Sequence, residues 1–146
     1  MIKRKAPRGF SLIEVLVAVF LVGVAVLGLA QLFLVAVANN LKADRVANAT
    51  FLAQQQIDWL RGFTREELDV LSTTASGIRD EIMDINGDGT NDFRRITVVP
   101  VPIDNVFQVM VHVYSAEKIS GLTASELLAD PVHHRPRAEF STLISR

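Results

Sequence analysis

Apolar residues are concentrated in one uninterrupted stretch near the start of the chain. No charged residue occurs over the 24 positions from Val15 to Ala38, and Gln31 is the only strongly polar side chain among them. A helix of this length rises about 36 Å, which exceeds the roughly 30 Å hydrocarbon core of a bilayer. The pattern therefore predicts a membrane-spanning helix.

Helical periodicity continues beyond this stretch. Apolar residues recur there at steps of three and four, on one face of a helix: Val46, Ala49, Ala53, Ile57 and Leu60. No proline interrupts the segment, and Gly62 is a suitable C-terminal cap. We predict one helix from Phe10 to Arg61, with a break near Asn39-Asn40 as the alternative.

The rest of the chain has the pattern of a small sheet with short helices. Thr64 and Glu67 have the spacing of a capping box, which predicts a helix after Thr64. Runs rich in β-formers predict strands at 93–101, 106–114 and 137–144, and a short helix is expected at 124–128. The sequence thus predicts an α+β fold in which a small antiparallel sheet packs on the amphipathic half of the long helix.

Charge is distributed unevenly. Four of the 15 basic residues precede the first acid: Lys3, Arg4, Lys5 and Arg8. The positive-inside rule keeps that end cytoplasmic and places the rest of the chain across the membrane. Without residues 1–9 the chain would hold 11 basic and 16 acidic residues, so nothing indicates a nucleic-acid partner. The chain has no cysteine, which excludes disulfides and thiolate chemistry.

One acid, Glu14, lies at the start of the apolar stretch. A carboxylate inside a bilayer costs at least about 2.5 kcal/mol, so such residues are usually paired or functional. If the chain were cut before Phe10, the new amine would lie one helical turn from Glu14 and could neutralise it, within the chain or from a neighbouring chain. The alternatives are that Glu14 marks the membrane boundary, or that an ordinary signal peptide is cut after Ala36-Val37-Ala38, although its apolar run would be long.

The segment from Gly9 to Ala18, GFSLIEVLVA, resembles the leader junction of type IV pilins and type II secretion pseudopilins. The resemblance implies that residues 1–9 are a leader, which a prepilin peptidase cuts between Gly9 and Phe10. It also implies methylation of the Phe10 amine and a role for Glu14 in assembly. The implied organisation is a transmembrane half-helix at 10–38, an amphipathic half-helix at 39–62 and a pilin-like headgroup at 63–146.

Two absences favour a minor subunit over the major fibre subunit. The membrane half of the helix has no proline, and the headgroup has no cysteine for a disulfide. The chain looks most like minor pilins of the type IV pilus modification protein PilV kind, and the related minor pseudopilin of type II secretion remains an alternative. The implied partners are other pilin subunits, the peptidase, the inner-membrane assembly platform and lipid. The implied location is the bacterial inner membrane, with a periplasmic headgroup, and then a pilus or pseudopilus; no catalytic activity is expected.

An acidic loop at residues 84–92 has the spacing D-x-N-x-D-G-x-x-D. This matches the first part of an EF-hand-type calcium loop, with oxygen ligands from side chains and a backbone carbonyl: Asp84, Asn86, Asp88, Thr90 and Asp92. Arg95 stands where the bidentate acid should be, so Asp80, Glu81 or Asp104 would have to complete the shell. A plain polar turn is the alternative. If the loop binds Ca²⁺, a single-span calcium-binding module that does not polymerise is a further alternative for the whole chain.

Three histidines carry no chemical pattern. His133 and His134 are adjacent and would point in different directions on a strand, so an exposed loop is expected. His112 is expected on a strand face without a chemical role.

Overall fold

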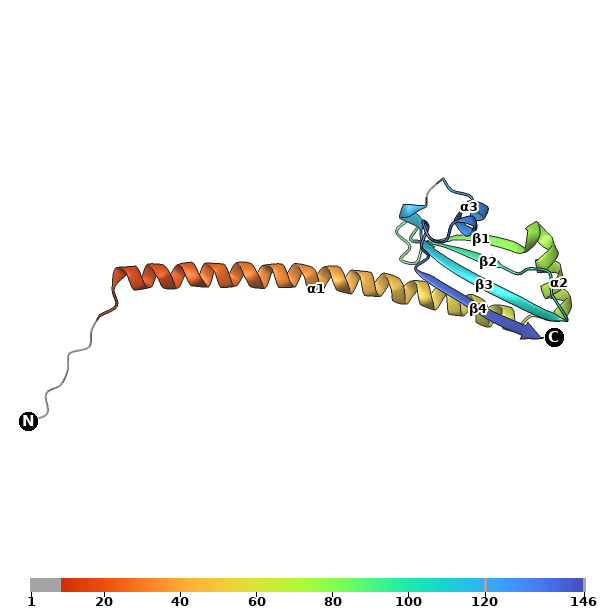
Figure 1. Ribbon diagram of the computed structural model, residues 1–146, viewed down its shortest axis with the longest axis horizontal. Coiled ribbons are helices and arrows are strands. Elements are labelled where there is room, and N and C mark those ends of the chain that lie inside the picture. The colour runs from red at the N-terminus through yellow and green to blue at the C-terminus, as the bar shows by residue number, and fades with distance from the viewer. Residues whose placement is uncertain (1–8, 120, 146) are drawn as a thin grey trace, which may run out of the picture. The chain divides into compact units, whose positions relative to one another are not determined.

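The computed structural model of the protein describes residues 9–119 and 121–145. Its elements are α1 (Leu12–Arg61), α2 (Arg65–Thr73), the 3₁₀ turn η1 (Thr74–Gly77), β1 (Ile78–Met83), β2 (Phe93–Val98), β3 (Val106–Ser115), the 3₁₀ turn η2 (Ala116–Lys118), α3 (Ala124–Ala129) and β4 (Ala138–Ser145) (Figure 1). The chain forms two compact units, which divide between Lys42 and Ala43. The basic residues of the expected leader, Lys3, Arg4, Lys5 and Arg8, lie outside the described residues.

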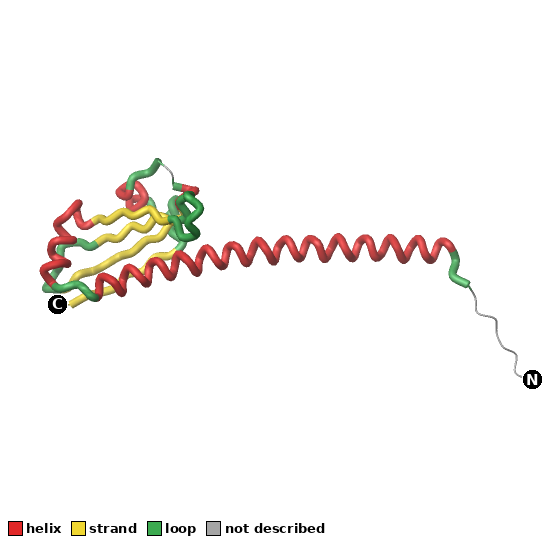
Figure 2. The backbone as a smooth tube through the Cα atoms, turned by 180° about the vertical axis from the view of Figure 1, so that it is seen from behind, coloured by secondary structure: helices red, strands yellow, loops and turns green. Residues whose placement is uncertain are grey.

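Helix α1 is one uninterrupted element that runs through Asn39 and Asn40 (Figure 2). The prediction of a single helix is therefore confirmed, but the helix begins at Leu12 and not at Phe10. The predicted cap is only partly right. Gly62 follows the last helical residue, yet it does not adopt a left-handed conformation. Its N–H donates to the Trp59 carbonyl at 3.1 Å instead, which tightens the last turn.

The sheet of the second unit has the order β1-β2-β3-β4, and every neighbouring pair is antiparallel. The α+β prediction is confirmed, and β2, β3 and β4 correspond to the three predicted strands. β2 ends at Val98, three residues before the predicted end. Asp104 and Asn105, both with positive φ, then form a tight turn before β3. Strand β1 was not predicted, because three consecutive charged residues obscure its apolar alternation.

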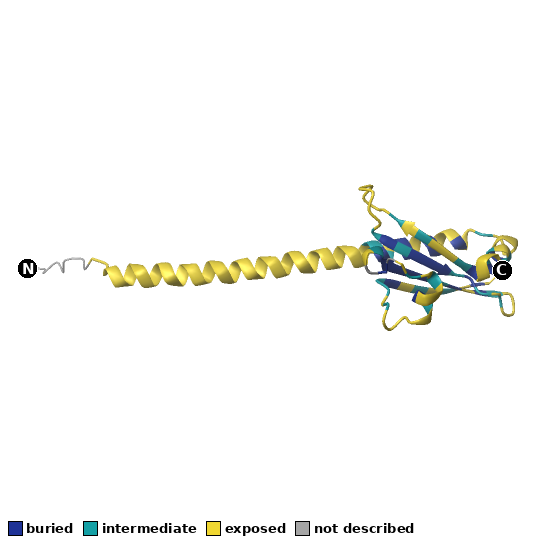
Figure 3. Cartoon of the chain, turned by 90° about the horizontal axis from the view of Figure 1, so that it is seen from above, coloured by how far each residue is buried: buried dark blue, intermediate teal, exposed yellow. Residues whose placement is uncertain are grey.

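The main core lies between the sheet and the second half of α1. Ala49, Ala53, Ile57 and Leu60 are buried as their periodicity predicted, whereas Val46 remains 39% exposed. They pack with alternate residues of β3 and with its neighbours: Phe107, Val109, Val111, Val113, Phe93 and Ile144. These strands contain the buried residues seen in dark blue (Figure 3).

A smaller core covers the opposite face of the sheet. Ile96 and Tyr114 pack there against Ile119 and Leu127, which come from the connection between β3 and β4. The expected helix in this connection is α3, and its N-cap Thr123 forms a capping box with Glu126. The capping box predicted for α2 is also present, since Thr64 and Glu67 exchange hydrogen bonds in both directions.

Candidate functional site

The expected processing point lies just before the first turn of α1. Gly9, Phe10 and Ser11 are exposed and precede the helix. The Ser11 carbonyl accepts hydrogen bonds from the N–H groups of Glu14 at 3.0 Å and Val15 at 3.3 Å, so the first turn begins there. A Cβ atom added at Gly9 would meet nothing within 4 Å. An enzyme could therefore reach this backbone without any other part of the described chain unfolding.

Because Phe10 is not helical, the expected pairing of its amine with Glu14 is not set by helix geometry within one chain. Ideal spacing of one turn requires both residues to be helical, and here only Glu14 is. The terminal amine of a neighbouring chain could pair with the Glu14 carboxylate without Phe10 of the same chain being helical.

The apolar half of α1 is exposed along its whole length in the part of the chain that the structure describes. Every residue from 9 to 47 is exposed, as Figure 3 shows in yellow. Among the described residues, α1 is the one helix long and apolar enough to cross a membrane, and the mean hydropathy of its most apolar 18-residue window is 2.8. An uncovered apolar surface of this extent requires lipid or like helices around it.

The acidic loop connects β1 to β2 and closes on itself through side-chain to backbone hydrogen bonds. The Asp84 carboxylate accepts from the N–H groups of Gly87 at 2.7 Å and Gly89 at 2.9 Å. Asp92 Oδ2 accepts from the Ile85 N–H at 3.0 Å. Such turns are the usual use of Asp beside Gly in loops.

Asp88 and Asn86 complete the internal hydrogen bonding of this loop. The Thr90 side chain and backbone N–H and the Asn86 amide donate to the Asp88 carboxylate, and these hydrogen bonds lower the pKa of Asp88. The Asn86 side-chain oxygen Oδ1 accepts from the Asp88 N–H at 3.1 Å. Most oxygens that were expected to bind Ca²⁺ are thus already occupied by donors of the loop.

Calcium binding by this loop depends on the acids that lie near it. Within residues 9–119 and 121–145, no three acidic or histidine side chains lie close enough together to hold a metal. Two of the acids considered for the missing ligand are engaged elsewhere, since Asp80 pairs with Arg94 and Glu81 with Arg95. The third, Asp104, lies in the turn before β3. An oxygen that accepts one of these hydrogen bonds keeps a second lone pair, so calcium binding stays a prediction.

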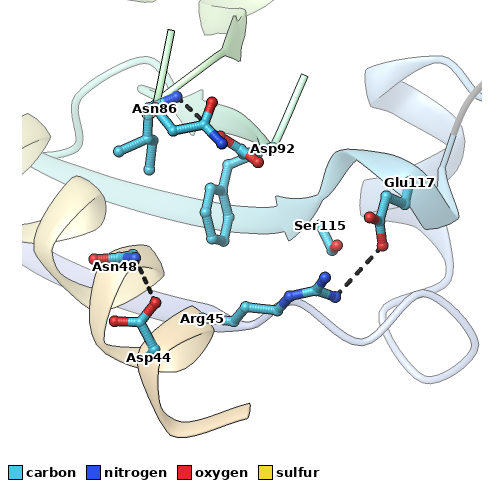
Figure 4. Close-up of a pocket in the computed structure, with 9 residues that line it drawn as sticks. Asp44, Arg45, Asn48, Asn86, Asp92, Ser115 and Glu117 are labelled. Atoms are coloured by element: carbon cyan, nitrogen blue, oxygen red, sulfur yellow. Dashed lines mark hydrogen bonds and ion pairs between the residues drawn. The ribbon is translucent and has the colours of Figure 1, made fainter. Parts of the chain in front are cut away.

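A polar groove of about 210 Å³ adjoins the acidic loop (Figure 4). Asn86 and Asp92 face it from the loop, and Asp44 and Asn48 face it from α1. Arg45 crosses its lower side to Glu117 at 3.4 Å. Both of these charged side chains are at least half exposed, so the ion pair contributes little to stability.

Two arginines that the sequence analysis missed tie the layers of the headgroup together. Arg95 donates to Glu81 of β1 at 2.6 Å and to the Leu52 carbonyl of α1 at 3.2 Å. Arg94 points to the other face, where it donates to Asp80 at 2.6 Å and to the Leu122 carbonyl at 2.6 Å. The sequence held one indication of these pairs. Two adjacent arginines follow Phe93 at the start of an apolar segment, and two adjacent acids, Asp80 and Glu81, precede them by 14 residues.

The histidines lie largely where they were expected. His133 is exposed, and its backbone N–H donates to Asp130. His112 is on strand β3, but it is buried, and its Nδ1 atom has no hydrogen-bond partner among the described residues. Burial lowers the pKa of His112, and the Glu139 carboxylate 3.9 Å away opposes this shift.

Comparison with known proteins adds one finding. Residues 4–30 match the family described as the prokaryotic N-terminal methylation motif. No curated protein and no solved structure matches the chain. The motif covers Gly9, Phe10 and Glu14, and with the long helix and the small antiparallel sheet it indicates a type IV pilin-like or pseudopilin precursor.

Proposed function

We propose that this chain is a minor type IV pilin of the modification-protein kind, a structural subunit and not an enzyme. It is anchored in the bacterial inner membrane by α1, cut between Gly9 and Phe10, methylated at Phe10, and assembled into a pilus through the apolar half of α1. The observation that carries the proposal is the methylation motif at residues 4–30, which includes the start of an apolar helix whose described residues are exposed as far as residue 47.

The partners follow from this surface. Lipid surrounds the apolar half of α1 before assembly, and the helices of other pilin subunits replace lipid in the fibre. When an apolar helix moves from lipid into a bundle of helices, it gains van der Waals packing but little hydrophobic free energy. Polar pairs therefore specify the register of one helix against the next. Glu14 is the acid available for such a pair, and its partner is the terminal amine of a neighbouring subunit.

Mass spectrometry of the N-terminus tests processing. The full chain is expressed in a strain that has a prepilin peptidase, and a terminus at methylated Phe10 is expected. A Gly9→Leu variant should retain its leader. An uncut leader in the unaltered chain would overturn the proposal and favour a permanent single-span anchor, and a cut after Ala38 would indicate an ordinary signal peptide.

Sheared fibres test the role of Glu14. A Glu14→Gln variant removes the charge at nearly the same volume, so it should be cut normally and yet be lost from the fibre fraction. A Gln31→Leu variant is the matched control, because it changes the strongly polar side chain within Val15–Ala38 and should assemble normally. Normal incorporation of Glu14→Gln would rule out the pairing.

A minor pseudopilin of type II secretion is the alternative, since the same motif precedes it. Deleting the gene distinguishes the two functions: loss of surface pili with normal secretion supports the minor pilin, and loss of secretion with normal pili supports the pseudopilin.

A further inference from the structure

The acidic loop between β1 and β2 contains the only asparagine of the sequence that precedes a glycine, Asn86 before Gly87. An asparagine side chain can close onto the backbone nitrogen of the next residue, which forms a cyclic imide and releases ammonia. Glycine at that next position favours the reaction, because it has no Cβ to obstruct the approach. Both residues are exposed, and a Cβ atom added at Gly87 would meet nothing of the described chain within 4 Å. The surroundings of Gly87 are therefore open.

The Asn86 side chain is folded back over the peptide that follows it. Its Oδ1 atom accepts from the Asp88 N–H at 3.1 Å, which is the hydrogen bond of an Asx turn. Its Nδ2 atom donates to Asp88 Oδ2 at 2.9 Å, so both polar atoms of the amide are held. A group that is held beside its reaction partner reacts faster than one that moves freely.

The backbone nitrogen of Gly87 has a base beside it. Its N–H donates to Asp84 Oδ1 at 2.7 Å, and a carboxylate at that distance can take the proton as the nitrogen attacks. Asp84 Oδ2 accepts from the Gly89 N–H at 2.9 Å, which fixes the carboxylate in place. The Asp88 N–H donates to the amide oxygen of Asn86, where negative charge develops during the attack, and stabilises that charge as an oxyanion-hole donor does.

Water can reach the reacting amide. Asn86 lines the polar groove of about 210 Å³ beside the loop (Figure 4). The charged residues that line this groove are Asp44, Arg45, Asp92 and Glu117. Arg45 pairs with Glu117, and Asp92 accepts from the Ile85 N–H. Among the charged side chains of the described residues, those that hydrogen-bond to the reacting atoms are therefore Asp84 and Asp88.

We infer that Asn86 is a site of spontaneous deamidation, with water as the co-reactant. The Gly87 nitrogen bonds to the Asn86 Cγ atom, the Cγ–Nδ2 bond breaks, and ammonia leaves with the proton that the nitrogen gives up through Asp84. Water then opens the ring at one of its two carbonyl carbons, which yields aspartate or isoaspartate. Nothing is oxidised or reduced. The chemistry needs only the loop and water, so it does not depend on processing or assembly of the chain.

The product changes the acidic loop. An anionic oxygen replaces the Nδ2 donor beside the Asp88 carboxylate, so a hydrogen bond of 2.9 Å becomes a repulsion between like charges. The isoaspartate form also adds a methylene group to the backbone between β1 and β2. Either product loosens the closed loop and gives this exposed connection one more negative charge.

Peptide mass spectrometry of the full chain in lipid nanodiscs, kept at neutral pH for several weeks, tests the inference. We expect a gain of about one mass unit at Asn86, with isoaspartate among the products. Asn91 is the internal control, because it is exposed in the same loop but precedes Asp92; it should change at least about a hundredfold more slowly. An Asn86 side chain that stays intact for as long as Asn91 overturns the inference.

Variants test the role of Asp84. Asp84→Asn removes the base at nearly the same volume and should slow the conversion of Asn86 at least about tenfold. Asp92→Asn, the same substitution in the same loop, is the control and should leave the rate unchanged, because Asp92 accepts from the Ile85 N–H instead. In guanidinium chloride every chain should react at one rate, since the contact with Asp84 exists only in the folded loop.

Two results would contradict this role. An equal rate for the folded Asp84→Asn variant and the folded unaltered chain overturns the inference. If the variant does not fold, the unaltered chain still decides, because the base and the oxyanion donor should make Asn86 react faster in the folded chain than in guanidinium chloride. A slower reaction in the folded chain means that the loop protects Asn86, and it overturns the inference.

Discussion

Replacing Glu81 by glutamine should destabilise the headgroup more than replacing its partner Arg95 by methionine. The Arg95 side chain is only 9% exposed, and Glu81 is the acid with which it pairs. The Glu81 side chain is 25% exposed and also receives a second ion pair, from Arg79 at 2.7 Å. Removing the acid therefore leaves a buried, unpaired arginine, whereas removing the arginine leaves an acid that still has a partner.

The magnitudes follow from what each substitution leaves behind. In Glu81→Gln a buried guanidinium loses its counter-charge, which costs about 4 kcal/mol when a buried pair is broken from one side. In Arg95→Met the remaining carboxylate keeps Arg79 and some water, so the loss is that of charge-assisted hydrogen bonds, about 2 kcal/mol. The methionine chain fills most of the space of the arginine stem.

Urea unfolding of the full chain in detergent, followed by fluorescence, measures this difference. Trp59 is the only tryptophan and lies in the second compact unit, residues 43–146, so the signal reports the unit that contains the headgroup. Glu117→Gln is the matched control, because it removes the acid of an exposed pair and should cost less than about 1 kcal/mol. A loss for Arg95→Met equal to or larger than the loss for Glu81→Gln would refute the reasoning.

Three further outcomes are expected. Gly77→Ala should destabilise the headgroup by more than about 3 kcal/mol, because its Cβ would lie 2.2 Å from the Val99 oxygen, whereas Gly87→Ala, with the same φ of 73° and open space, should cost about 1 kcal/mol in the same urea assay. Since burial lowers the pKa of His112, the unfolded chain binds a proton that the folded chain does not, so stability should fall as the pH drops below about 6.5. His112→Gln should flatten that fall between pH 7.5 and 5.5, and an unchanged slope would contradict it. If the acidic loop binds Ca²⁺, calorimetric titration after chelation should release or absorb heat that Asp84→Asn abolishes; no heat would leave the plain turn.

The long helix was predictable because its signals agree with one another. A run without charge, a continuing three-four periodicity and the absence of proline all favour helix, and only the first two residues were assigned wrongly. The periodicity also identified the face that packs on the sheet. The periodicity could not identify Leu52 or Gln56 as buried, because the width of the buried face of a helix depends on the element that packs against it.

Strand β1 and the arginine pairs could not be predicted in the same way. Arg79, Asp80 and Glu81 suggest a solvated turn until the partners of the two acids on β2 are known, and each of these partners lies 14 residues away along the chain. The processing segment is the opposite case, because a peptidase recognises local sequence and no fold is needed to find it. The acidic loop is intermediate: its spacing was correct for an oxygen-lined turn, but spacing alone does not decide whether backbone N–H groups or an ion occupy those oxygens.

The sequential order of the sheet has a consequence for the way in which the headgroup forms. Because each strand pairs with the next one along the chain, no strand has to wait for a distant partner before it can hydrogen-bond. The β1–β2 and β2–β3 connections are short, which keeps the entropy cost of closing them low, whereas the β3–β4 connection runs from Ala116 to Arg137 and includes η2 and α3. The second half of α1 precedes all four strands, so a chain that emerges from the N-terminus onward presents its packing surface first. We expect each hairpin to add to that surface in order, which shortens the time during which apolar strand faces are open to aggregation.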